Sequence, residues 1–133
     1  MKLIVLILNK VDTLEFLLED LSAAGVKGAT ILQSQGMAMT LAQIGSSLIS
    51  NSIRALFSSD DLESRTILIV AKEEQVSIIR KIIYHSVGDL KDPNTGILFT
   101  VPVDFIDGLP EYNKEEKPTV EEAELAEQPE ENV

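Results

Sequence analysis

An unbroken run of six apolar residues, LIVLIL at positions 3–8, restricts the folds open to this chain. A strand with one solvated face alternates apolar and polar residues, whereas a continuous run is typical of a strand covered on both faces. The run is far shorter than the roughly 18–20 residues of a membrane span. It is also too short for a signal peptide and lacks a small-residue cleavage site after it. We therefore expect a buried strand in a cytoplasmic protein.

The rest of the sequence predicts two helices and three more strands. Asp12 and Glu15 have the spacing of a capping box at the start of a helix, and Gly25 suits its C-terminal stop. The elements after the first strand are expected at residues 13–24, 29–33, 65–71, 73–84 and 97–103. Their order of helix, strand, strand, helix, strand predicts an α+β class protein with a ferredoxin-like βαββαβ sandwich.

The predicted sheet has one face without a helical layer. Two helices cover only one face of four strands, yet the runs at 3–8 and 66–70 are apolar at successive positions. Monomeric proteins rarely expose large apolar patches. We therefore predict that other copies of the chain cover the open face, with a closed ring of three, a homotrimer, as the first expectation.

Charge and composition divide the chain into a folded domain at 1–110 and an acidic tail at 111–133. The tail holds nine Glu against two Lys and few large apolar residues, a composition typical of disorder. The net charge of −11 comes without a basic stripe, which argues against binding to nucleic acid. The absence of cysteine excludes a disulfide framework and a thiolate nucleophile.

The connection between the second and third strands is much longer than a hairpin turn, since residues 36–64 separate them. Apolar residues recur in it at helical spacing, at Leu41, Ile44, Leu48, Ile49, Ile53, Leu56 and Phe57. This stripe either packs on the protein's own body or a neighbouring subunit, or binds a partner protein as a helix in a groove. Arg54 is the only cation between Gly36 and Ser64, which argues against direct insertion into lipid.

Three short motifs accompany this order of elements. Gly25-Val26-Lys27-Gly28-Ala29-Thr30 is similar to a G-x-x-G-M-T segment that opens strand two, and Gly36 stands where a partner-contacting T-loop begins. Asn94-Thr95-Gly96-Ile97-Leu98-Phe99 is similar to a glycine-rich B-loop that runs into strand four. With these motifs, residues 1–108 resemble the PII signal-transduction family, and residues 37–64 correspond to its T-loop.

The resemblance implies a regulatory trimer with an adenine-nucleotide pocket between subunits and a T-loop that binds a partner protein such as a membrane transporter. The ligand-binding residues that it implies are Gly28, Thr30, Gly36, Met37, Gly88, Asp89, Thr95 and Gly96. The family holds the triphosphate with cations at positions that read Met39, Ile97 and Phe105-Ile106-Asp107-Gly108 in this chain. A nucleoside, a monophosphate or another small molecule therefore stays open as the ligand, with Lys10 and Lys91 as the nearest cations along the chain.

Catalytic and metal-binding patterns are weak. His85 is the only histidine, so a two-histidine metal motif is excluded, and no metal site is predicted. Acylphosphatases share the order of elements but place an arginine after strand one, where this chain has Lys10. We therefore expect a non-enzymatic regulator, with a structural trimer that binds no small molecule as the alternative and an acylphosphatase-like enzyme as the lesser one.

Overall fold

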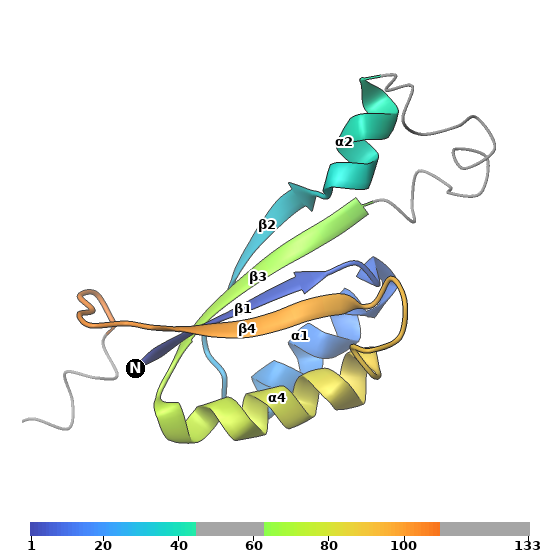
Figure 1. Cartoon of the computed structure of the whole chain (residues 1–133). Coiled ribbons are helices and arrows are strands. Elements are labelled where there is room, and N and C mark those ends of the chain that lie inside the picture. The colour runs from blue at the N-terminus through green and yellow to red at the C-terminus, as the bar shows by residue number, and fades with distance from the viewer. Residues whose placement is uncertain (45–62, 110–133) are drawn as a thin grey trace, which may run out of the picture. The chain divides into compact units, whose positions relative to one another are not determined.

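Four strands pair into one antiparallel sheet in the computed structural model of the chain, which describes residues 1–44 and 63–109 (Figure 1). The strands are β1 (Lys2–Leu8), β2 (Thr30–Gln35), β3 (Glu63–Ala71) and β4 (Gly96–Pro102), and they lie in the order β2-β3-β1-β4. The predicted run at 3–8 is therefore a central strand, with β3 and β4 as its neighbours. The α+β class is confirmed, and the sheet is compatible with the predicted ferredoxin-like arrangement.

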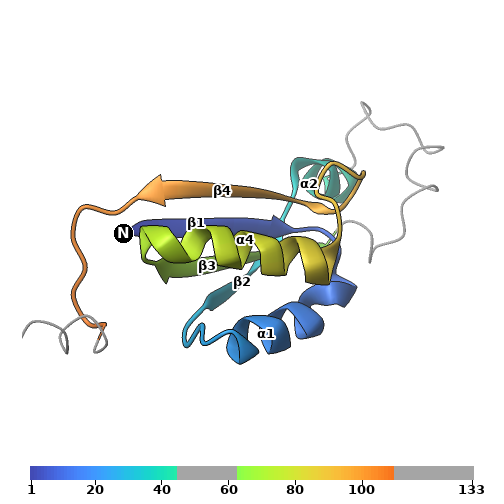
Figure 2. The same ribbon diagram turned by 90° about the horizontal axis from the view of Figure 1, so that it is seen from below.

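Two helices, α1 (Leu14–Ala23) and α4 (Glu73–Val87), lie side by side on one face of the sheet (Figures 1 and 2). The hydroxyl of Ser86 in α4 donates a hydrogen bond of 2.7 Å to the Asp20 carboxylate in α1 and so joins the two helices. The helix α4 runs one turn beyond the predicted end at residue 84. Its C-terminal residue is followed by Gly88, which has a φ of +100° and whose N–H donates to the Tyr84 carbonyl.

The predicted capping box at Asp12 and Glu15 is wrong. A short 3-10 helix, η1 (Val11–Thr13), precedes α1 and places Asp12 inside the first turn. The helix α1 has Thr13 as its N-cap without a side-chain cap, because the Thr13 hydroxyl donates to the Lys10 carbonyl at 2.7 Å instead. Asp12 and Glu15 have the spacing of a capping box, but a 3-10 helix already begins at Val11, so Asp12 lies within that helix and is not the N-cap of α1.

The core lies between the sheet and the two helices. Side chains of alternate residues in a strand point to opposite faces, and the even-numbered residues of β1 point toward the helices. Each fully buried Leu or Ile contributes about 1.5–3 kcal/mol relative to exposure. The buried cluster consists of Ile4, Leu6, Leu8, Leu17, Leu21, Ile67, Ile69, Ala71, Ile79, Ile83 and Val87.

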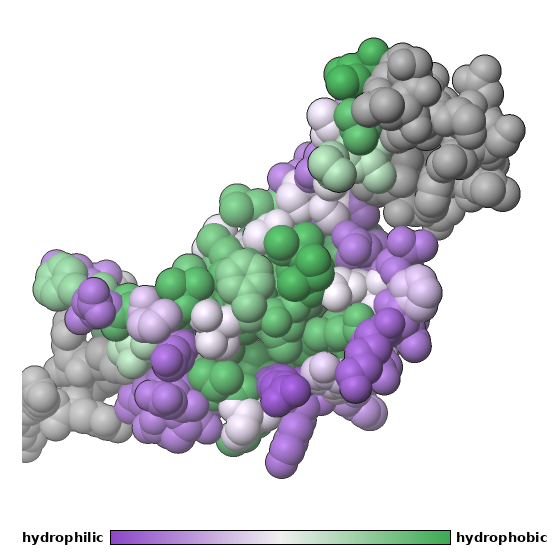
Figure 3. All heavy atoms as spheres, viewed as in Figure 1, coloured by the Kyte–Doolittle hydropathy of each residue, from purple (hydrophilic) through white to green (hydrophobic). Residues whose placement is uncertain are grey.

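The opposite face of the sheet is also apolar, and no described helix covers it. The register pairs the odd residues of β1 mostly with apolar residues of β3 and β4, as in Val5 with Leu68 and with Phe99; the exception is Thr66, opposite Ile7. Ile97 has 59% of its surface exposed there. We call this surface the open face; its apolar side chains are Leu3, Val5, Ile7, Leu32, Leu68, Val70, Ile97, Phe99 and Val101. Figure 3 shows hydrophobic side chains gathered over the strands.

The connection from β2 to β3 spans residues 36–62 and begins with a helix, α2 (Met37–Gln43). The side-chain amide of Gln35, the last residue of β2, donates hydrogen bonds to the Thr40 hydroxyl at 3.1 Å and to the side-chain Oε1 of Gln43 at 2.8 Å. The connection thus begins with a helix that contains Leu41 of the predicted apolar stripe, while residues 45–62, which hold most of that stripe, lie outside the described part.

Residues Met1–Val103 form one compact unit, and Asp104–Val133 are assigned to a second. The predicted tail at 111–133 lies outside the described residues. Within the described part, no helix is both long and apolar enough to cross a membrane.

Candidate functional site

Two loops meet where β1 ends and β4 begins. The Thr95 carbonyl accepts hydrogen bonds from the N–H groups of Asn9, at 3.0 Å, and Lys10, at 3.2 Å. The Lys10 ammonium lies 3.5 Å from the Val87 carbonyl at the end of α4. The structure therefore brings together Lys10 and four of the predicted ligand-binding residues, which are Gly88, Asp89, Thr95 and Gly96.

Each of these four residues also has a structural role in its loop. Gly88 needs its positive φ to end α4. The Asp89 carboxylate accepts the N–H of Lys91 at 2.9 Å, and Thr95 is buried with its hydroxyl 3.4 Å from the Pro93 carbonyl. Gly96 lies against the backbone of β1, so a side chain there would collide with it. Glycine and threonine at these positions are thus explained by the fold alone.

The other four predicted ligand-binding residues lie at the opposite edge of the sheet. Thr30 begins β2 and Gly28 precedes it, while Gly36 and Met37 follow the end of that strand. Strands β3 and β1 separate β2 from β4, so three strand spacings, about 14 Å, divide the two sets. A single chain does not bring the eight residues into one site.

Two of the positions that carry phosphate-binding cations in the PII family lie in different elements of the first unit. Met39 is half-buried in α2, and Ile97 belongs to the open face. Residues 105–108 belong to the second unit. Among the described residues, no group of three or more histidine and acidic side chains could hold a metal ion.

The predicted partner-binding residues are described only in part. Ile44, just after α2, is 70% exposed, and Met37 at the start of α2 is 79% exposed. Leu41 is half-buried. Leu48, Ile49, Ile53, Leu56 and Phe57 lie outside the described residues. The described start of the connection therefore presents apolar side chains to solvent.

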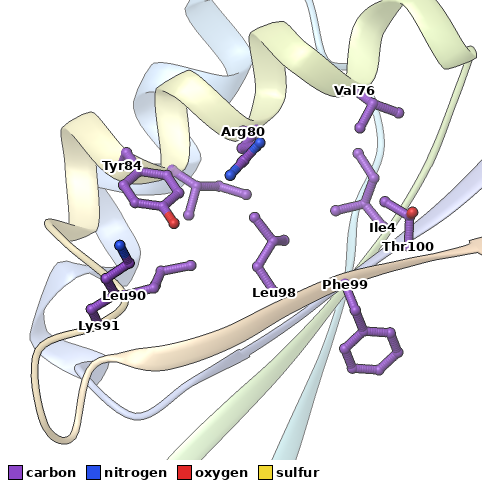
Figure 4. A pocket seen from close by; sticks show the side chains of 10 residues that line it. Ile4, Val76, Arg80, Tyr84, Leu90, Lys91, Leu98, Phe99 and Thr100 are labelled. Carbon is purple, nitrogen blue, oxygen red and sulfur yellow. The ribbon is translucent and has the colours of Figure 1, made fainter.

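A pocket that the sequence did not indicate lies between α4, the loop after it and β4, with a volume of about 410 Å³ (Figure 4). Its floor is apolar, since the side chains of Ile4, Ile83 and Leu98 belong to the core or pack against it. Val76 and Thr100 line one end, and Tyr84 and Lys91 line the other. The pocket lies on the helical side of the sheet, opposite the open face.

Two cations stand at this pocket, and neither has an acidic partner in the part of the chain that the structure describes. The Arg80 guanidinium lies 5.8 Å from the centre of the Tyr84 ring, close enough for a cation–π interaction. No carboxylate of the described residues lies within 4.0 Å of the side-chain nitrogens of Arg80 or Lys91. Lys91 was recognised from the sequence as a candidate cation, but Arg80 and Tyr84 were not. Their spacing of four on a predicted helix could have indicated that they share a face.

Neither the models of known protein families nor the curated proteins give a match to this chain. The resemblance to the PII family therefore stays a prediction from short motifs and the order of elements.

Proposed function

We propose that this chain is a non-enzymatic, PII-like regulatory protein that assembles as a homotrimer through the open face and binds a partner protein through the β2–β3 connection. The observation that carries the proposal is the apolar open face. The partner is a protein such as a membrane transporter with a cytosolic surface, and a small ligand in the cleft between subunits controls its binding.

The chemistry of the open face supports self-association. Val70, Ile97, Phe99 and Val101 are all exposed on it, around the less exposed side chains of β1. Removing apolar surface from water is the dominant favourable contribution to most protein–protein association. In a closed ring of three, the same face of every copy can turn toward the threefold axis, so that no copy leaves its open face exposed.

The division of the predicted ligand-binding residues supports a cleft between subunits. Gly36 and Met37 follow β2, whereas Gly88 and Gly96 flank the loop before β4, at the same end of the sheet but at opposite edges. Residues at opposite edges of one sheet meet when the β2 edge of one copy approaches the β4 edge of the next. Backbone N–H groups at these glycines can then approach an adenine nucleotide or another small ligand.

The start of the β2–β3 connection supports the role in partner binding. The helix α2 continues from the end of β2 and holds Met37, whose side chain is largely exposed, and Ile44 follows it. Exposed apolar residues on a short helix suit docking into an apolar groove of another protein. This surface is distinct from the open face, so assembly and partner binding do not compete for the same side chains.

Light scattering tests the assembly. The intact chain at micromolar concentration is expected at three times its monomer mass of 14.6 kDa. Phe99→Glu places a charge on the open face and is expected to give monomers with an unchanged circular dichroism spectrum. Phe16→Glu is the matched control, because Phe16 is exposed on α1, on the other side of the sheet. A monomeric mass for the intact chain would contradict the proposal.

Ligand and partner binding separate the regulator from its alternative, a structural trimer without a small ligand, which the open face supports equally. A thermal-shift series with ATP, ADP and AMP is expected to show stabilisation by at least one of them, because a specific ligand stabilises the folded state by mass action. Partner recovery by the intact chain is expected to exceed that by a chain lacking residues 40–58. No thermal shift together with equal recovery would favour the structural trimer.

A further inference from the structure

We propose that the pocket between α4 and β4 binds a small amphiphilic monocarboxylate, with the carboxylate at Arg80 and Lys91 and the apolar body along the floor. This site shares the loop before β4 with the predicted cleft between subunits, but its lining contains none of the eight predicted ligand-binding residues. It is formed within one chain, so it does not depend on the proposed assembly or on the β2–β3 connection.

The size and lining of the pocket suit a ligand of this class. Its volume of about 410 Å³ lies within the roughly 300–1,000 Å³ of small-molecule sites. Ile83 and Ile4 are almost completely buried beneath it, and Leu98 and Leu90 pack against the same core. An apolar body placed here exchanges water for contacts with aliphatic side chains, which is favourable.

The polarity of the pocket is uneven along its length, as Figure 4 shows. Val76, Ile4 and Thr100 stand at one end, and Tyr84, Leu90 and Lys91 stand at the other. Arg80 and Leu98 lie between the two ends. A ligand that is polar at one end and apolar at the other therefore matches the pocket in one orientation. This asymmetry argues against a uniformly polar metabolite and against a purely apolar one.

The cations supply the charge preference. Arg80 and Lys91 have no carboxylate within 4.0 Å among the described residues, as is also true of Lys2, Lys10 and Lys81, but only Arg80 and Lys91 line the pocket. The acids of α4, Glu73 and Glu74, lie seven and six positions before Arg80, beyond the spacing of three or four at which helical side chains meet. The Asp89 carboxylate accepts the backbone N–H of Lys91.

The polar groups of the pocket can bind a carboxylate. The planar guanidinium of Arg80 presents paired N–H donors that match the two oxygens of a carboxylate. The Lys91 ammonium adds a second charge, and the Tyr84 hydroxyl can donate a further hydrogen bond. Two cations at the rim of an apolar pocket balance a monoanion more closely than the several charges of a triphosphate.

The pocket stays accessible when the open face is covered. Strand β4 contributes to both surfaces because its side chains alternate: Leu98 points toward α4, and the ring of Phe99 points away from the pocket (Figure 4). Covering the open face therefore leaves Arg80, Tyr84 and Lys91 exposed. Ligand binding in the pocket and assembly of the chain are separate events.

Isothermal titration calorimetry of the full-length chain with octanoate tests the proposal. Octanoate is expected to bind with saturation. The neutral 1-octanol, which has the same chain length, and acetate, which has the charge without the apolar body, are each expected to bind at least tenfold more weakly. Absence of saturable octanoate binding would overturn the proposal, and so would equal binding of either comparison compound.

Variants locate the site. Arg80→Gln is expected to weaken octanoate binding roughly tenfold or more, because a hydrogen bond to a charged group is lost. Lys81→Gln removes the same charge from the next residue of α4, which is exposed and does not line the pocket, and is expected to leave binding unchanged. Val76→Phe fills the apolar end and is expected to abolish binding without changing charge. Equal weakening by Arg80→Gln and Lys81→Gln would show general charge attraction and overturn the site.

Discussion

A Cβ atom on Gly96, at the start of β4, would lie 2.7 Å from the carbonyl oxygen of Ile7 in β1. Real Cβ atoms do not approach backbone oxygens so closely, so the two strands pair here only because residue 96 is glycine. Gly96 was predicted as a ligand-binding glycine from its resemblance to a B-loop. The close approach of β1 explains why residue 96 is glycine without any role in ligand binding.

Gly96→Ala is therefore expected to lower the free energy of unfolding by about 1–3 kcal/mol, the usual cost of overpacking a rigid site. Urea unfolding followed by circular dichroism measures it. Gly28→Ala is the matched control: it has open space around its Cβ position and no positive φ, and its stability is expected to change by less than about 0.5 kcal/mol. Equal effects of the two substitutions would contradict the close approach.

The core between α4 and the sheet predicts different costs for two neighbouring isoleucines. Ile79 is 2% exposed and Ile78 is 55% exposed. Ile79→Ala is expected to cost about 2–5 kcal/mol, because it leaves a cavity that the surroundings fill only in part. Ile78→Ala is expected to cost less than about 1 kcal/mol. Urea unfolding of both variants tests the face that α4 turns to the sheet, and a larger loss for Ile78→Ala would show a different rotation of the helix.

The hydrogen bond from Ser86 to Asp20 joins α1 to α4 and predicts coupling between their substitutions. Ser86→Ala and Asp20→Ala are each expected to destabilise the chain, and the double variant less than the sum of the two, with a coupling of about 1 kcal/mol. A double-mutant cycle from unfolding curves measures it. In the control cycle, the exposed Ser77 of α4 replaces Ser86, and the free-energy changes of Ser77→Ala and Asp20→Ala are expected to add.

The side chain of Gln35 predicts how firmly α2 is held. Its amide donates to both Thr40 and Gln43, so Gln35→Ala is expected to speed hydrogen exchange of the α2 amides about two- to fivefold, as expected for loss of exposed hydrogen bonds. Gln33→Ala, two residues earlier on the same face of β2, is the control and is expected to leave exchange in α2 unchanged. Exchange that is already at the unprotected rate in the intact chain would contradict an ordered α2.

Local patterns predicted the elements well, because the periods of helix and strand depend on neighbouring residues only. The stripe after Glu73 predicted α4, and the run at 65–71 predicted β3 within two residues. The wrong prediction of a capping box at Asp12 and Glu15 has a local cause too. Two residues three positions apart lie differently relative to each other in a 3-10 helix than in an α-helix.

The candidate site was less predictable, since it depends on which elements become neighbours. Arg80 and Lys91 lie on different elements, and they line one pocket only because α4 packs over β4. Gly36 and Gly96 were predicted for one ligand, yet β2 and β4 are the two edges of the sheet. The spacing of residues along the chain does not show which strands become neighbours in the sheet. That order forms together with the packing of both helices on one face.

The apolar run at 3–8 already required a strand covered on both faces, because every residue in it avoids water and a strand turns alternate residues to opposite sides. The tertiary structure decided how the two sides differ. Ile4 and Leu6 are buried beneath α1 and α4, whereas Leu3 and Ile7 belong to the open face. Hydrophobic burial has no direction of its own, so only the placement of the helices decides which half of the run the chain covers itself.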